Sequence, residues 1–552
     1  MSSHRFPLGR ACLSSVIIAS ACSAPPPTPA TTSSIASPLQ GSLDWPGYNN
    51  DLQGDRFSPL SEINTSNVAQ LKTICSYTLP EVTALQTGPI VVSGTMYFTT
   101  DTISYAIDAS TCAEKWKTVR RSETPSALGV NRGFAYMNGR LFRGTSDVHA
   151  LALDAATGRV LWDRVLDVKA PGVSVPMAPI ASNGLVYIGN AGGDIARIIG
   201  HVYALDANDG HVVWKWDAVP ATGPARSTWQ NTRLPISGAA FWTSFTLDPQ
   251  SGILYVPVGN PAPDFDVELR KGDNLYSNSV VALDAATGTM LAYNQIVKHD
   301  AHDWDVDSPP ALVRTQSGKL IVASANKDGR LSILDRSRVS RGASPTAPTP
   351  VMPLLSQSPT TTRSNTDVLL SRNYPTRFCP GIQGGNEWNG AAYSPRTNSL
   401  YTAAVDWCAR VQLKKDTLTL PPAGPGAYWF GAETPQAEIM EPADSARGWF
   451  TAFDAETGAI RWRYKAPHPM LAAVTPTAGG IVFAADMSGQ LYAFDAAAGK
   501  ILWQTDLGQS TGGGIVSYNA GGRQLLGIAS GMKSPIWPGG STQSRIVVLG
   551  LR

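Results

Sequence analysis

One short plan recurs along the chain and limits what it can fold into. An apolar strand ends in Asp, a tight turn follows, and a second strand usually ends in Trp. The Asp can accept hydrogen bonds from its own turn, Gly supplies a positive φ, and Trp can fill the gap between neighbouring sheets. The copies are YAIDASTCAEKW (105–116), LALDAATGRVLW (151–162), YALDANDGHVVW (203–214), VALDAATGTMLA (281–292), TAFDAETGAIRW (451–462) and YAFDAAAGKILW (492–503). The tryptophans predicted to pack between sheets are Trp116, Trp162, Trp214, Trp462 and Trp503.

The spacing of the repeat aspartates predicts an all-β fold, an eight-bladed β-propeller. Most intervals suit one four-stranded blade, because propeller repeats run roughly 40–50 residues. The interval from Asp335 to Asp454 is too long for one blade and contains the hairpin AAYSPRTNSLYTAAV (391–405), so we expect the 336–453 stretch to supply an unmarked blade. The marked aspartates are Asp108, Asp154, Asp206, Asp284, a degenerate copy at Asp335, Asp454 and Asp495.

The two ends of the propeller are expected to meet. RIVVLGL (545–551) is predicted to pair with the chain near CSYTLP (75–80), and closing the ring in this way protects strand edges. The composition agrees, because Gly 51, Pro 41 and 15 Trp favour many short strands and turns. Lys+Arg 44 against Asp+Glu 42 leaves no basic surplus, so no nucleic-acid partner is expected.

Residues 1–21 resemble a lipoprotein-type signal peptide. Arg5 and Arg10 precede the apolar run LSSVIIAS, which is too short to span a bilayer. The segment ends in ASAC, similar to a lipoprotein cleavage site with Cys22 as the lipidated residue; Ala stands where Leu is usual, so plain signal cleavage stays open. Residues 22–43 are rich in Pro, Ser and Thr and predict a flexible tether before the propeller at 44–552. We expect a periplasmic protein that touches the membrane only through this lipid anchor.

Export permits disulfides. Beyond the signal segment and Cys22, the chain keeps Cys75, Cys112, Cys379 and Cys408, an even number consistent with two bridges. No CxxCH occurs, so covalent haem c is excluded. The chain also has no CxxC pair that would indicate a zinc site.

The decapeptide KHDAHDWDVD (298–307) crowds four aspartates and two histidines into one stretch. Like charges this close destabilise a fold unless something positive lies among them. The stretch is therefore either an exposed acidic loop or part of a metal site. It belongs to the longest single-blade module, which also carries Asn260 at the end of the strand ILYVPV, on a rim.

Several motifs in order resemble the quinoprotein (PQQ-dependent) alcohol dehydrogenases, with polyvinyl-alcohol-dehydrogenase-like members the most similar branch. The resemblance runs from residue 44 almost to the C-terminus. It implies an eight-bladed propeller that holds pyrroloquinoline quinone (PQQ) in its central funnel and oxidises an alcohol. The motifs are VNRG (130–133), GNAGGD (189–194), FWTSF (241–245), GNPAP (259–263), RKGDNLYSNSVVALD (270–284) and ANKDG (325–329).

The resemblance also implies roles for single residues. Trp242 would be the aromatic floor under the quinone, and Arg132 would hold one of its carboxylates in two-point geometry. Lys327 would stabilise negative charge on the reduced ring. Gln86 stands at a cofactor-binding position where Glu is usual, and Glu387 stands where Asn is common. PSALG occupies the place of the family's vicinal cysteine pair.

The implied cation, Ca²⁺ or a lanthanide, would take oxygen ligands from Asp194, Asn260, Asp303 and Asp305. Asp194 stands where the family usually has the longer Glu. We place the catalytic base at Asp303, with Asp305 the alternative register. Lanthanide-using members carry a second Asp two residues after the base, and both registers supply one, Asp305 or Asp307.

The resemblance further implies a Cys379–Cys408 disulfide, and we predict Cys75–Cys112 as the second. The function expected is oxidation of an alcohol, with hydride passing to PQQ and electrons passing to a separate acceptor such as a cytochrome c. Two alternatives stay open. One is a cofactor-free lipoprotein propeller that scaffolds outer-membrane assembly, and the other is a degenerate protein that binds PQQ without turnover.

Overall fold

The computed structural model describes residues 43–124, 128–167, 172–230, 234–342, 349–416, 420 and 428–552. The predicted signal peptide, Cys22 and all but the last residue of the predicted tether lie outside these residues. Leu39–Arg552 form one compact unit. Among the described residues, no helix has the length and apolar character needed to cross a membrane.

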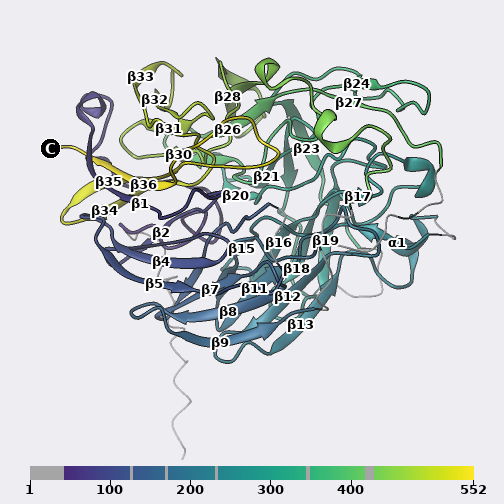
Figure 1. Cartoon of the computed structure of the whole chain (residues 1–552), viewed down its shortest axis with the longest axis horizontal. Coiled ribbons are helices and arrows are strands. Elements are labelled where there is room, and N and C mark those ends of the chain that lie inside the picture. Colours follow the sequence, from purple (N-terminus) through teal and green to yellow (C-terminus); the bar gives the residue numbers. More distant parts are fainter. Residues whose placement is uncertain are drawn as a thin grey trace, which may run out of the picture. The chain divides into compact units, whose positions relative to one another are not determined.

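Eight four-stranded antiparallel sheets, blades 1 to 8, make up the described part of this unit (Figure 1). Blade 1 is β2 (Ile90–Val92), β3 (Thr95–Thr99), β4 (Ile103–Asp108) and β5 (Glu114–Val119); blade 2 is β6 (Ala135–Met137), β7 (Arg140–Gly144), β8 (His149–Asp154) and β9 (Val160–Val165). Blade 3 is β10 (Ile180–Ser182), β11 (Leu185–Gly189), β12 (His201–Asp206) and β13 (Val212–Asp217); blade 4 is β15 (Thr246–Asp248), β16 (Ile253–Pro257), β18 (Ser279–Asp284) and β19 (Met290–Gln295).

Blade 5 is β20 (Ala311–Arg314), β21 (Leu320–Asn326), β22 (Arg330–Asp335) and β23 (Leu354–Pro359); blade 6 is β25 (Ala392–Ser394), β26 (Ser399–Asp406), β28 (Arg447–Asp454) and β29 (Ile460–Ala466). Blade 7 is β30 (Thr475–Pro476), β31 (Ile481–Ala485), β32 (Gln490–Asp495) and β33 (Ile501–Asp506); blade 8 is β34 (Ile515–Ala520), β35 (Arg523–Ser530), β36 (Arg545–Gly550) and β1 (Lys72–Thr78). Outside the blades lie the pairs β14 (Ser237–Gly238) with β17 (Pro261–Ala262) and β24 (Thr376–Phe378) with β27 (Ala409–Val411), the helix α1 (Pro224–Ser227), and the 3-10 turns η1 (Val68–Gln70), η2 (Val267–Leu269), η3 (Gln436–Glu438) and η4 (Ala443–Ser445).

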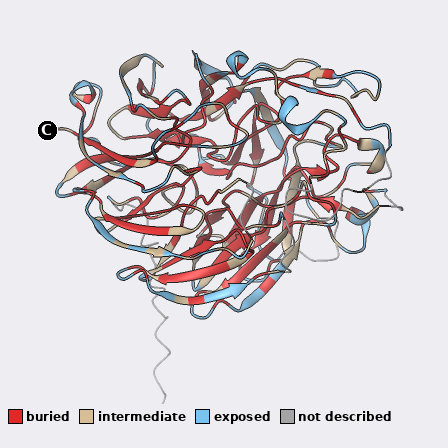
Figure 2. Cartoon of the chain, viewed as in Figure 1, coloured by how far each residue is buried: buried red, intermediate tan, exposed pale blue. Residues whose placement is uncertain are grey.

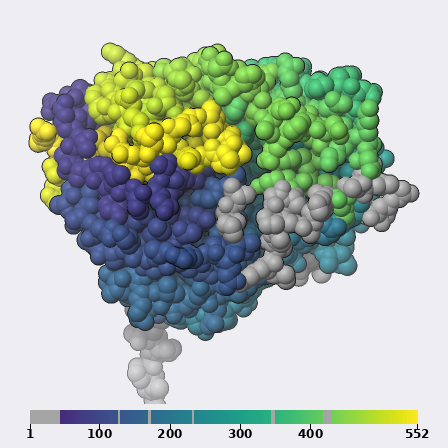
Figure 3. All heavy atoms as spheres, viewed as in Figure 1, coloured from purple at the N-terminus to yellow at the C-terminus, as the bar shows by residue number. Residues whose placement is uncertain are grey.

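The predicted eight-bladed propeller is confirmed, and so is the closure of its ring. β1 pairs antiparallel with β36 and completes blade 8. Figure 3 shows the C-terminal part, in yellow, lying against the purple N-terminal part of the described chain. Figure 2 shows the inner strands of the blades largely buried, whereas fourth strands such as β5 alternate exposed and half-buried residues.

Our placement of the unmarked blade within 336–453 is wrong. The hairpin at 391–405 forms β25 and β26, the first two strands of blade 6, whose third strand carries the marked Asp454. The extra length lies in two segments, one between blades 5 and 6 that contains β24 and one between β26 and β28 that contains β27. The unmarked blade is blade 8, because its fourth strand comes from the other end of the propeller and no turn joins its third strand to its fourth.

Four of the five tryptophans predicted to pack between blades stack on the turn of the next blade, whereas Trp503 packs against the cluster that contains Val68 and Leu71. A Cβ added to Gly158, which has φ +72, would lie 2.5 Å from the Trp116 ring of the preceding blade. The Trp116 indole N–H also donates to Ala155 O at 3.0 Å. The same indole-to-carbonyl bond recurs from Trp162 to Ala207, from Trp214 to Ala285 and from Trp462 to Ala496.

A disulfide takes the place of this stack where the ring closes. Cys75 lies just after the register shift in β1 and pairs with Val548. Trp116 has the same position in β5, where it pairs with Ala106 beside the register shift. Its partner Cys112 lies in the blade 1 turn, at the Gly position of the repeat, with φ 60. The Cys75–Cys112 bond therefore joins blade 8 to blade 1 at the point where other blades use Trp on Gly.

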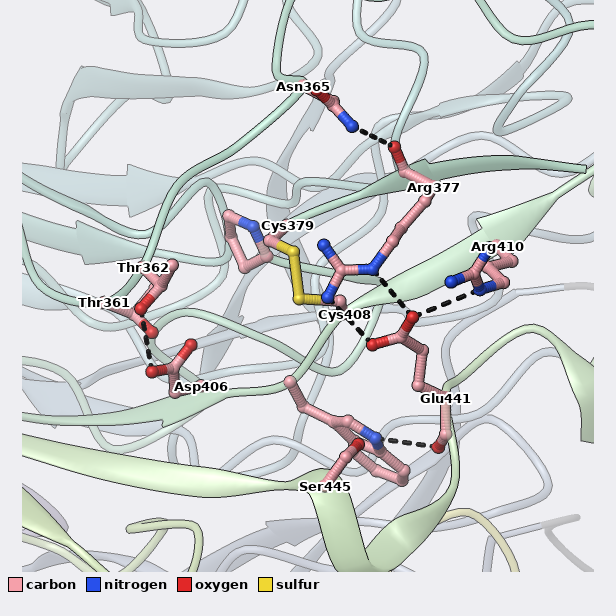
Figure 4. The surroundings of a disulfide bond; sticks show 12 residues. Thr361, Thr362, Asn365, Arg377, Cys379, Asp406, Cys408, Arg410, Glu441 and Ser445 are labelled. Atoms are coloured by element: carbon pink, nitrogen blue, oxygen red, sulfur yellow. Dashed lines mark hydrogen bonds and ion pairs between the residues drawn. A yellow bond between two sulfur atoms is a disulfide. The ribbon is translucent and has the colours of Figure 1, made fainter.

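The second predicted disulfide, Cys379–Cys408, is also present (Figure 4). The two cysteines stand at the paired ends of β24 and β27, where Phe378 lies opposite Ala409. The Glu441 carboxylate accepts hydrogen bonds from Arg377 and Arg410 over this pair (Figure 4). The bridge thus ties the segment between blades 5 and 6 to the segment that interrupts blade 6.

We predict that replacing Cys75 and Cys112 together with Ser lowers the free energy of unfolding by about 2–4 kcal/mol, the usual range for a disulfide. Hydrogen exchange in β1 should rise, because the fourth strand of blade 8 then loses its cross-link to the turn of blade 1. Exchange mass spectrometry measures this directly. The matched control, Cys379→Ser with Cys408→Ser, should leave exchange in β1 unchanged. Unaltered exchange of β1 in the first variant would contradict the assignment.

Candidate active site

The predicted site residues converge at one end of the ring. In an antiparallel pair the start of the first strand lies beside the end of the second, so loops at both places share one edge. Residues that precede a first strand are Gln86, Arg132, Trp242, Asp303, Asp305 and Glu387; those that follow a second strand are Asp194, Asn260 and Lys327.

An ion-paired group forms the centre of the site. The Lys327 ammonium lies 2.7 Å from Asp305 Oδ2 and 3.2 Å from Asp303 Oδ1. Asp305 Oδ1 accepts the Asn260 backbone N–H at 2.9 Å. A Cβ on Gly259 would lie only 2.7 Å from that oxygen, so Gly is required there. Burial alone would lower the pKa of Lys327, but the carboxylates of Asp303, Asp305 and Glu387 raise it well above its usual value.

Three carboxylates gather beside this ion pair. One oxygen each from Asp194, Asp264 and Asp303 lies within 4.8 Å of the others. Burial raises the pKa of Asp264 and of Asp303 well above the usual range, and neighbouring carboxylates add to both shifts. Burial raises the pKa of Asp194 to about 6, although Lys327 and the Asn260 amide oppose the shift. Burial and mutual repulsion therefore disfavour the charged forms of these carboxylates unless a cation lies among them.

Arg270 positions the loops that carry these carboxylates. Its buried guanidinium donates to Pro263 O at 2.9 Å, to Asp264 O at 2.8 Å and to Asp300 O. Asp300 in turn accepts the N–H of Trp304 at 2.8 Å, and the Trp304 ring is buried. The decapeptide 298–307 is therefore a buried loop rather than an exposed acidic one.

Arg132 and Trp242 lie in the loops that lead into blades 2 and 4. Arg132 donates to Gln86 Oε1 and to Trp242 O, both at 2.8 Å. Its guanidinium carbon lies 4.9 Å from the Trp242 ring centre and 5.3 Å from that of Trp388. Trp242 is half-buried, whereas the rest of FWTSF is buried, so part of the indole remains free to contact a ligand.

Glu387 and Asp307 add buried negative charge between these two groups. Burial raises the pKa of Glu387 to about 8; Asp305 reinforces the shift, while Lys327 and Arg132 oppose it. Both oxygens of Asp307 are buried without a hydrogen-bond partner, and burial together with Glu387 raises its pKa well above the usual range. The site therefore carries more carboxylates than its cations can neutralise.

The structure brings together every site residue named from the sequence, and it adds Asp264 and Trp388. Sequence reasoning missed Asp264 because GNPAPD resembles a rim turn, in which Asp is ordinary. Trp388 follows Glu387 in GGNEW, and only its neighbours in space reveal it. Asp305 lies outside the group formed by Asp194, Asp264 and Asp303 and contacts Lys327 instead.

Comparison with known proteins identifies the family. The sequence model for the β-propeller domain of PQQ glucose/ethanol/alcohol dehydrogenases matches residues 45–340, more than half of the chain. The chain belongs to this quinoprotein dehydrogenase family. A second model, for the outer membrane protein assembly factor BamB, matches only residues 446–528 of this quinoprotein.

Relatives of this quinoprotein extend over most of its length. It is 27% identical to the quinoprotein alcohol dehydrogenase PedH of Pseudomonas putida, over 90% of this chain and 87% of that protein. It is 27% identical to the lanthanide-dependent methanol dehydrogenase of Methylacidiphilum fumariolicum, over 88% and 84%. The crystal structure of the quinohemoprotein alcohol dehydrogenase from Comamonas testosteroni superposes with a TM-score of 0.80 at 25% identity, covering 92% of this chain and 80% of that one.

The raised pKa of Glu387 predicts a pH-dependent stability. A carboxyl whose folded pKa exceeds its unfolded value stabilises the fold at low pH, and this stability is lost as pH rises through the folded pKa. Glu387→Gln abolishes the effect. The melting temperature of Glu387→Gln minus that of wild type should therefore rise between about pH 4.5 and about pH 8 and stay constant above about pH 8. The measurement uses cofactor-free protein with a chelator. The exposed control Glu438→Gln should show no such trend, and a flat difference for Glu387→Gln would contradict the assignment.

Proposed function

We propose that this quinoprotein is a PQQ-dependent alcohol dehydrogenase with Ca²⁺ or a lanthanide ion at its site. The observation that carries the proposal is a buried set of carboxylates beside Lys327, in the same site as an arginine and two tryptophan rings. The experiment that tests it adds PQQ with Ca²⁺ or a lanthanide to cofactor-free protein and follows alcohol-dependent reduction of an artificial dye. No turnover with any small or polymeric alcohol would contradict it.

The residues present fit a cation. Both oxygens of buried Asp264 lack a hydrogen-bond partner, and Asp194, Asp264 and Asp303 repel one another unless a positive charge lies among them. Carboxylate and amide oxygens suit a hard cation, so Asp194, Asp264, Asp303 and the Asn260 amide would hold it. When bound, the cation acts as a Lewis acid and PQQ accepts hydride.

The residues present also fit PQQ. Trp242 offers a partly free indole face on which a planar ring can stack. Gln86 accepts a hydrogen bond from Arg132 and is neutral, so the positive charge of Arg132 is kept. A Glu at this position would cancel that charge. The Arg132 Nε atom is buried without a partner. Arg132 therefore keeps both charge and a donor for a carboxylate of PQQ.

We propose Asp305, rather than our first choice Asp303, as the base that takes the hydroxyl proton. The Lys327 ammonium and the Asn260 N–H each contact one oxygen of the Asp305 carboxylate and hold it in one orientation. Each of its oxygens keeps a lone pair for a proton. Asp303 instead lies with Asp194 and Asp264 in a group of carboxylate oxygens that one ion could share, which suits a ligand.

Asn substitutions separate the two roles. Asp305→Asn should lower turnover by about 10²–10⁴-fold, the usual worth of a positioned base, and should still bind the cation. Asp303→Asn should mainly weaken cation binding, with activity partly restored by excess ion. Steady-state rates across an ion titration measure both effects. If Asp303→Asn instead lost turnover and Asp305→Asn lost cation binding, Asp303 would be the base, and Asp305 with Asp307 would be the cation ligands.

Trp242→Ala should abolish PQQ binding and leave the propeller folded, because the indole is only half-buried and packs against the hydrophobic cluster around Trp388 rather than on the turn of a neighbouring blade. Fluorescence titration with PQQ and thermal unfolding measure the two properties. The control Trp214→Ala removes a stacking tryptophan and should lower stability instead. Retained PQQ binding in Trp242→Ala would remove this residue from the site.

We also propose a periplasmic location, a lipid anchor at Cys22 and a separate electron acceptor such as a cytochrome c. The sequence of residues 1–43 supports the first two, and the lack of CxxCH supports the third. A cofactor-free scaffold would not require the buried Lys327, Asp303 and Asp305 group. A degenerate PQQ-binding protein remains the second candidate, favoured by the shorter Asp194.

A further inference from the structure

We propose that Asp264 is a direct ligand of the active-site cation, and that its carboxylate adapts the site to a trivalent ion. The inference deepens the proposed function and rests on it for the presence of a cation. Neither the sequence motifs nor the family resemblance points to this residue, which lies four positions after Asn260 in the loop between β17 and η2.

The geometry of the three carboxylates fits one ion. Ligand oxygens lie 2.3–2.6 Å from a calcium-sized ion, so two of them can be at most about 5 Å apart. The oxygens of Asp194, Asp264 and Asp303 lie within 4.8 Å of one another. Three carboxylates at these separations therefore match a single shared cation.

The surroundings of Asp264 give an independent sign of a missing ligand. Its side chain is fully buried, and neither carboxylate oxygen has a hydrogen-bond partner. Leaving a buried polar group unpaired is costly, and an ionised one far more so. Asp264 is therefore placed to bind something that protein atoms do not supply.

The two nearest cationic side chains direct their bonds elsewhere. Arg270 donates to the backbone oxygen of Asp264, not to its carboxylate, and uses its other donors on Pro263 O, Asn274 Oδ1 and Asp300 O. Lys327 contacts Asp303 and Asp305. Arg270 thus positions the loop while the Asp264 carboxylate stays available to an ion.

The number of carboxylates at the site determines whether a trivalent ion or Ca²⁺ binds more strongly. Lys327 offsets Asp305, so Asp194, Asp264 and Asp303 present about three negative charges to the ion. Coulomb attraction grows with the charge product, so each added carboxylate favours a trivalent ion more than Ca²⁺. Asp264 also supplies an oxygen where the short Asp194 reaches less far than Glu would.

The test is terbium binding to cofactor-free protein, measured by sensitised luminescence, with Ca²⁺ competition and luminescence lifetimes in H₂O and D₂O to count bound waters. Asp264→Asn should weaken Tb³⁺ binding by at least about tenfold. Loss of a residue that only hydrogen-bonds to a metal ligand already weakens metal affinity by about tenfold, and loss of a ligand should weaken it at least as much. It should weaken Ca²⁺ binding less and should add bound water at the ion. The control Asp266→Asn removes a nearby carboxylate that pairs with Arg372 at 2.9 Å, and it should change neither quantity.

Wild-type affinity and hydration in Asp264→Asn, with binding lost in Asp303→Asn, would overturn the ligand assignment and leave the proposed function standing. Equal losses for Tb³⁺ and Ca²⁺ would overturn the trivalent preference. Thermal unfolding without metal checks folding, and Asp264→Asn should be at least as stable as wild type there because it relieves repulsion. Failure of the proposed function has a different signature, Tb³⁺ binding by wild-type protein that does not bind PQQ.

Discussion

Closure of the ring is the constraint on which the rest of the structure depends. Four blades dock a fourth-strand tryptophan on the turn of the next blade, and β1 with β36 completes the circle. Site residues from Gln86 to Glu387 come from loops of different blades, so their mutual distances are set only when the blades are held in register. The Cys75–Cys112 bridge ties the closing strand β1 to the turn of blade 1.

A closed ring can hold what an open sheet could not, a dense group of buried carboxylates. Asp194, Asp264, Asp303 and Glu387 all have raised pKa values because burial disfavours their charged forms. Lys327 satisfies part of this charge, and the remainder calls for a bound cation. The buried carboxylates that repel one another at the centre of the site are therefore the same groups that would bind a cation for chemistry on an alcohol.

Much of the fold could be read from the sequence because the Asp-turn-Trp repeat reports the turn between third and fourth strands. That signal failed in blade 8 for a physical reason, since its third and fourth strands are not joined by a turn. The site residues came from ordered motifs and the family they resemble. Asp264 escaped because its role depends on Arg270 and on carboxylates from two other loops, which no local pattern reports. The Cys75–Cys112 pair was predicted, but its equivalence to a tryptophan stack needed the strand register.

The most direct measurement is an anomalous-scattering crystal structure of the protein with PQQ and a lanthanide bound. The account predicts one strong peak within ligand distance of Asp194, Asp264, Asp303 and the Asn260 amide, with the quinone plane against Trp242 and one of its carboxylates on Arg132. An ion bound away from these carboxylates, or a quinone that contacts neither Trp242 nor Arg132, would contradict it.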